Sequence, residues 1–72
     1  MPPHIPTALL VDDILLEAMI GGTYREMPGL ALELSDAARL FGLREATCSI
    51  LLEDLVRQGC LRRASDGRYV TP

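Results

Sequence analysis

Lysine and tryptophan are absent from this sequence of 72 residues, and aromatic residues make up only 4% of it. All of its basic side chains are therefore arginines, and with ten acidic residues against them the formal net charge is −3. This sign argues against general electrostatic attraction to nucleic acid. Because aromatic residues are so few, the sequence predicts a small core of aliphatic side chains in a single domain.

Long apolar runs, metal-ligand clusters and catalytic sets are also missing. No uncharged apolar run of about 18 residues occurs, so we expect no membrane span. The N-terminus also lacks the basic segment with which a signal peptide begins, which predicts a cytoplasmic protein. Cys48 and Cys60 are expected to be small buried hydrophobes, and His4 has no cysteine nearby, so no metal and no cofactor is predicted.

An enzyme is not expected either. The sequence has no Ser/His/Asp set and no glycine-rich phosphate loop. The adjacent acidic pairs Asp12–Asp13 and Glu53–Asp54 are interpreted as solvated faces of helices.

Residues 34–59 predict two helices joined by a tight turn. Ser35 is a suitable N-cap for the first helix, which should end at Phe41 because Gly42 can adopt the sharp turn that follows. The second helix carries an apolar stripe at helical spacing. This stripe comprises Cys48, Leu51, Leu52, Leu55 and Val56. The small residue Ala38, then Gly42, then Cys48 fit the spacing of a helix-turn-helix.

A hairpin is predicted directly after the second of these helices. Two short β-like runs follow Gly59, and Asp66-Gly67 between them is a strong turn signal because Gly67 can adopt a positive φ. A helix-turn-helix followed by a hairpin is a winged helix. The alternative is a plain helical hairpin that packs on a larger partner, with residues 60–71 as a loose tail.

The N-terminal part predicts a flexible tail, a helix and a short strand. The tail spans residues 1–7, and the winged-helix domain spans residues 8–72. With Thr7 as N-cap, the helix should run from about Ala8 to Met27 across Gly21-Gly22, unless the chain breaks at these glycines. Alternating leucines over residues 30–34 predict a third strand for the hairpin. The expected fold is therefore α+β, in the order helix, strand, helix, helix, strand, strand.

The first helix is apolar on nearly all sides, which is more than one small core can cover. Among its residues, Ile14, Leu15 and Met19 are the candidates for a second buried surface. We interpret this surplus as a homodimer contact through the first helix; the alternative is that some of these side chains are simply exposed.

Residues 42–70 resemble the DNA-binding winged helices of bacterial IclR-type and MarR-type regulators in their helix-turn-helix, in Gly59 and in the DGRY hairpin. Residues 26–43 also resemble small stand-alone bacterial winged-helix proteins. The resemblance implies a transcription regulator that binds double-stranded DNA, with the second helix of the motif in the major groove and the hairpin on the backbone or minor groove. The residues expected to contact DNA are Arg44, Thr47, Ser49, Arg62, Arg63 and Arg68.

Two positions depart from that pattern. Ile50 stands where IclR-type sequences are commonly basic, and an exposed isoleucine can offer only an apolar contact to a thymine methyl group. Arg44 stands where a capping residue usually begins the helix, at a cost of about 1 kcal/mol. The alternative function is therefore a winged helix that binds a protein partner, with Ile50 and the first helix as docking surfaces.

Overall fold

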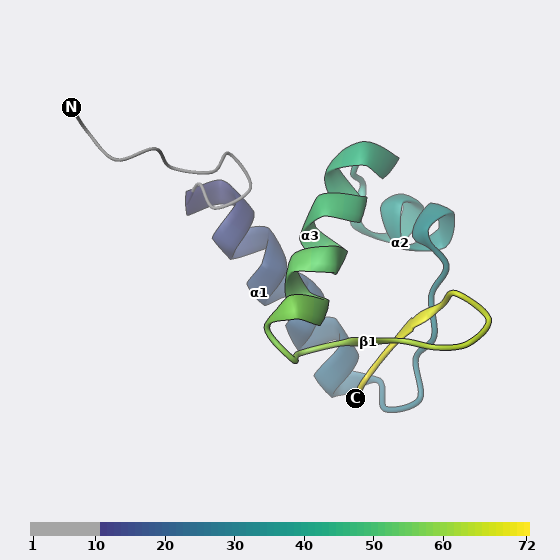
Figure 1. Cartoon of the computed structure of the whole chain (residues 1–72). Coiled ribbons are helices and arrows are strands. Elements are labelled where there is room, and N and C mark those ends of the chain that lie inside the picture. Colours follow the sequence, from purple (N-terminus) through teal and green to yellow (C-terminus); the bar gives the residue numbers. More distant parts are fainter. Residues whose placement is uncertain (1–10) are drawn as a thin grey trace.

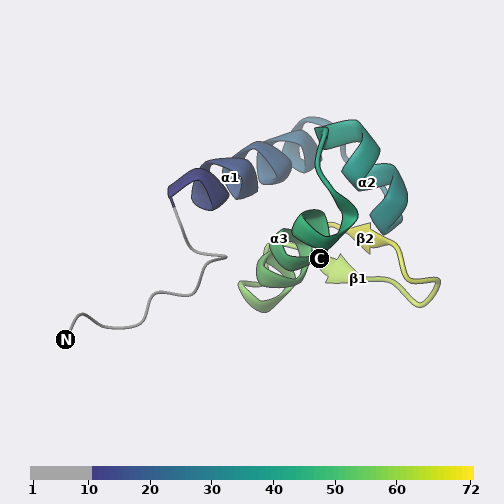
Figure 2. The same ribbon diagram turned by 90° about the horizontal axis from the view of Figure 1, so that it is seen from above.

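The computed structural model describes residues 11–72, which form three helices and one hairpin in an α+β arrangement (Figure 1). The helices are α1 (Val11–Glu26), α2 (Leu34–Phe41) and α3 (Glu45–Arg57). The strands β1 (Arg62–Arg63) and β2 (Tyr69–Val70) pair antiparallel, with Arg62 opposite Val70 and Arg63 opposite Tyr69. Figure 2 shows α3 beside both α1 and α2, with the hairpin following its C-terminal end.

α1 continues without a break across Gly21 and Gly22, so the prediction of one long helix is confirmed and the alternative break is wrong. Its inner face buries Ile20 and Tyr24, which are 0% and 2% exposed. This packing offsets the cost of two glycines in a helix interior. The predicted tail, the Thr7 cap and the start of the helix lie outside the described residues. No described helix is long and apolar enough to cross a membrane.

α2 begins one residue earlier than its predicted cap. Glu33 is the N-cap residue, and no side-chain hydrogen bond caps the helix, so the assignment of Ser35 as N-cap is wrong. The helix starts here because Leu34 packs against the core as its first helical residue. The predicted end at Phe41 is confirmed, and Gly42 adopts a left-handed conformation with φ 69°.

The segment predicted as a third strand is reduced to one bridge. Leu32 pairs antiparallel with Tyr69 through two backbone hydrogen bonds of 3.2 Å and 2.8 Å. With α2 beginning at Leu34, too little extended chain precedes it for a longer ladder.

The core lies between the three helices and is closed by the hairpin. Its most buried side chains include Tyr24, Tyr69, Ile20, Leu51, Leu52 and Cys48. The expectation of a buried cysteine is therefore confirmed for Cys48. It is wrong for Cys60, which is exposed because the chain turns at Gly59, with φ 80°, before the strand begins.

Candidate nucleic-acid interface

The outward face of α3 is short and only weakly charged. Its exposed residues include Ala46, Ile50 and Arg57, while Glu53 is half-buried between them and the hairpin. Ile50 is 50% exposed. The middle of this face is therefore apolar, and its charges lie at the edges.

Arg44 lies at the start of this face as the N-cap residue of α3. Its backbone is extended, with φ −67° and ψ 148°, and its side chain makes no capping hydrogen bond. It is exposed and forms no ion pair with any residue from 11 to 72. Arg44 is therefore available to an anion at the N-terminus of a helix, where backbone N–H groups also favour negative charge.

Thr47 and Ser49 flank the exposed face rather than sharing it. Both side chains are half-buried. Residues two apart on a helix project about 160° from one another, so these hydroxyls do not lie side by side. The structure places one on each side of the stripe that contains Ala46 and Ile50.

The three arginines that were predicted to contact DNA from the hairpin differ in their ion-pair partners. Arg62 is exposed and has no ion-pair partner among the described residues. Arg63 donates to Glu53 at 3.1 Å, and its guanidinium carbon lies 5.1 Å from the centre of the Tyr69 ring. Arg68 approaches Glu33 and Asp66, each at 3.7 Å. Of these three arginines, Arg62 alone can meet a phosphate without giving up a partner within residues 11–72.

Glu53 fixes the hairpin on α3. One of its carboxylate oxygens accepts from both Arg63 and the Tyr69 hydroxyl. Burial, with the neighbouring Glu53 carboxylate, raises the pKa of Tyr69 to about 12, so this hydroxyl keeps its proton at neutral pH. The Glu53 carboxylate thus adds two side-chain contacts to the backbone hydrogen bonds that Cys60 and Leu61 donate to Leu55 of α3.

The tip of the hairpin is a four-residue turn that ends in a left-handed glycine. The N–H of Gly67 donates to the carbonyl oxygen of Ala64 at 2.9 Å, and Gly67 has φ 89°, as predicted. Ser65 and Asp66 are the central residues, so the turn lies one residue earlier than the Asp66-Gly67 pair suggested. Asp66 also accepts from the backbone N–H of Arg68 at 3.1 Å.

The apolar residues predicted for protein contact lie on two separate elements. On α1, Ile14 is 53% exposed, Leu15 63% and Met19 43%. Ile50 belongs to the outward face of α3, so the four residues are divided between two helices. Among the described residues no group of three potential ligands is placed to hold a metal ion.

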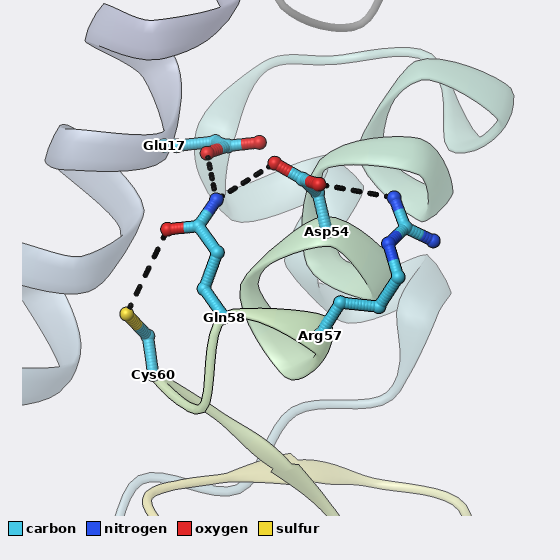
Figure 3. A network of polar contacts seen from close by, with 5 residues as sticks. All are labelled: Glu17, Asp54, Arg57, Gln58 and Cys60. Carbon is cyan, nitrogen blue, oxygen red and sulfur yellow. Dashed lines mark hydrogen bonds and ion pairs between the residues drawn. The ribbon is translucent and has the colours of Figure 1, made fainter.

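The sequence interpretation missed a polar cluster between α1 and α3 (Figure 3). Glu17 and Asp54 are 8% and 9% exposed, which shows that Asp54 does not belong to a solvated face. Gln58 donates its amide hydrogens to both carboxyl groups. One signal was present, because Glu17 lies on the same side of the first helix as Ile20 and Tyr24.

Comparisons of the chain with protein family models, with curated proteins and with solved structures find no match.

Proposed function

We propose that this protein is a winged helix-turn-helix protein that binds double-stranded DNA and regulates transcription. In this arrangement α3 enters the major groove, and the hairpin lies on the backbone or in the minor groove. Arg44 and Arg62 contact phosphates first, and Arg63 and Arg68 exchange their intramolecular carboxylate partners for phosphates. Thr47 and Ser49 lie beside the base edges.

The observation that carries this proposal is a pair of exposed arginines, Arg44 and Arg62, that have no ion-pair partner among residues 11–72. Arg44 lies at the beginning of the helix and Arg62 on the hairpin that follows its end. Glu53 holds the hairpin beside the helix, which supports a surface already arranged before DNA arrives. The small number of cations predicts modest affinity with a marked dependence on salt.

The test is a salt titration by fluorescence anisotropy on random and genomic duplexes. Neutralising about four phosphates gives a log–log slope of roughly −3 to −5. Arg44→Ala and Arg62→Ala should weaken binding to all sequences alike and flatten the slope by about one each. Arg25→Ala on α1 is the matched control, because it removes one arginine outside α3 and the hairpin, and it should leave the slope unchanged. Absence of binding at about 50 mM salt and tens of micromolar protein would overturn the proposal.

Variants of Thr47 and Ser49 distinguish contacts to the bases from contacts to the DNA backbone. Thr47→Ala or Ser49→Ala should alter the preference among sequences without changing the salt slope, because a hydroxyl can contact base edges but carries no charge. An unchanged preference in both variants would limit the function to binding that does not depend on sequence.

The second candidate function is protein binding, and the exposed Ile50 at the centre of the α3 face favours it. In this arrangement the apolar centre of the face docks on a partner, while Leu15 and Met19 on α1 contact a second copy of the chain. Ile50→Asp would then abolish partner binding, and DNA affinity would be negligible in the wild-type protein as well.

A further inference from the structure

The contact between α1 and α3 contains two carboxyl groups bridged by one amide (Figure 3). The Nε2 atom of Gln58 donates to Glu17 Oε1 at 3.0 Å and to Asp54 Oδ2 at 2.8 Å. Arg57 donates to the other oxygen of Asp54 at 3.0 Å. Both oxygens of Asp54 are therefore satisfied as acceptors, which suits an ionised carboxylate.

Glu17 is in a different situation, because its Oε2 atom is buried and has no donor among residues 11–72. An ionised carboxylate oxygen buried in this way costs free energy. A proton on Oε2 removes the cost, since the resulting hydroxyl can donate to the Asp54 carboxylate, toward which Glu17 is turned in Figure 3. Two carboxyl groups that share one proton are the usual outcome when like charges meet in a buried site.

The pKa shifts of the two carboxyl groups also place the proton on Glu17 rather than on Asp54. The pKa of Glu17 is raised to about 7, mainly by burial and to a smaller extent by hydrogen bonding to Asp54. The negative charge of Asp13 on the same helix adds a smaller repulsion. Hydrogen bonds from Glu17, Arg57 and Gln58 hold the pKa of Asp54 below its usual value. The proton therefore belongs to Glu17.

A cleft of about 450 Å³ offers Glu17 a second position, since Glu17, Gln58, Arg25 and Cys60 all line it. The guanidinium group of Arg25 lies back over Gly21, with Nη1 3.7 Å from the place a Cβ would occupy there. Gly21 is one helical turn from Glu17. An ionised Glu17 can thus turn away from Asp54 into a wetter space beside a cation.

We propose that Glu17 and Asp54 form a proton latch, in which one shared proton holds α1 against α3 and its loss to solvent releases Glu17 into the cleft beside Arg25. The released state loses the hydrogen bond from Gln58 to Glu17, which links α1 to the residue that follows α3. The contact between the two helices therefore loosens as the pH rises through neutrality. The latch does not depend on DNA binding, so its test and the DNA titration have separate outcomes.

The direct test is a carbon-detected NMR titration of the Glu17 side chain in the full chain between pH 4 and 9. The carboxyl carbon of Glu17 should titrate with a midpoint near 7, and the backbone amides of α1 around it should shift with the same midpoint. A midpoint near the ordinary value of 4.5 would overturn the latch. A midpoint near 7 without movement of the α1 amides would also overturn it, because the proton would then hold nothing in place.

Glu17→Gln tests the role of the proton, because its amide NH₂ takes the place of the shared proton and still donates to Asp54. In the wild-type protein the folding equilibrium constant should fall by roughly a hundredfold as the pH rises from about 4.5 to above 7, since only the folded chain holds the proton in that window. The variant should lose this dependence and be more stable than wild type at pH 8. Glu26→Gln at the exposed end of α1 is the control and should keep the wild-type dependence.

Asp54→Asn keeps the proposal falsifiable if Glu17→Gln does not fold. The amide introduced on α3 would donate to an ionised Glu17, so the Glu17 midpoint should fall by at least about one unit. An unchanged midpoint would show that burial alone protonates Glu17 and that no proton is shared.

Discussion

The hydroxyl group of Tyr24 on α1 donates a buried hydrogen bond of 2.8 Å to the backbone carbonyl oxygen of Tyr69 on β2. The same oxygen accepts the backbone N–H of Leu32 at 3.2 Å. Three segments distant in sequence therefore meet at one atom: the first helix, the connection to α2 and the hairpin. Burial raises the pKa of Tyr24 to about 12, so this donor is present throughout the neutral range.

Tyr24→Phe should destabilise the fold by about 1 kcal/mol, because it removes this donor but leaves the carbonyl oxygen with its bond from Leu32. Chemical denaturation followed by circular dichroism would measure the change. Tyr24→Leu, which also leaves a cavity, should cost clearly more. A Tyr24→Phe variant as stable as wild type would show that the hydroxyl makes no net contribution.

Gly67→Val should destabilise the hairpin by at least about 1 kcal/mol, because a β-branched residue strongly disfavours the left-handed backbone at this position. Apart from its chain neighbours, no heavy atom of residues 11–72 lies within 4 Å of a Cβ added at Gly67, so the cost arises from backbone conformation and not from a clash. Gly67→Asn is the informative comparison, since asparagine tolerates this conformation. Equal thermal stability of the wild-type protein and both variants would contradict the observed turn.

Glu53→Gln should strengthen the proposed DNA binding while lowering stability by less than about 1 kcal/mol, because the ion pair with Arg63 is partly exposed and the amide oxygen can still accept from the Tyr69 hydroxyl. The change frees Arg63 from its 3.1 Å contact and leaves it available to a phosphate. The anisotropy titration should therefore show tighter binding and a salt slope steeper by about one. Glu26→Gln makes the same change in net charge away from the hairpin, and an equal gain from it would show that only the overall charge matters.

Leu15→Glu should dissociate a dimer formed through α1, because it places a charge at a large apolar residue that is 63% exposed. Sedimentation velocity at several concentrations would report the assembly state. Leu40→Glu is the matched control, since Leu40 is 54% exposed but lies on α2. If the wild-type protein sediments as a monomer at high micromolar concentration, the proposed dimer does not form.

The elements that the sequence predicted best are those with purely local causes. Gly42 and Gly67 adopt positive φ values where the pattern required a sharp turn. The start of α2 was misplaced because Ser35 is a good cap in isolation, whereas packing of Leu34 decides where the helix begins. Local preference gives way to burial at that boundary.

The polar cluster was not predictable to the same degree, because it depends on which helices meet. Glu17 and Asp54 are 37 positions apart in the sequence, and nothing local indicates that they face one another. The partners of the hairpin arginines are tertiary in the same sense, since Arg63 meets a residue of α3 and Arg68 one that precedes α2. The sequence identified which residues carry charge, and the fold determines which of those charges remain available.

Neither α2 nor α3 has a side chain that caps its N-terminus, and α2 is only eight residues long. Isolated helices shorter than about 12–15 residues are marginal in water even in favourable sequences. We therefore expect α2 and α3 to be marginal on their own and to need packing against the rest of the domain to remain helical. Folding should be a single cooperative event, in which the proposed recognition surface appears only when the whole domain does.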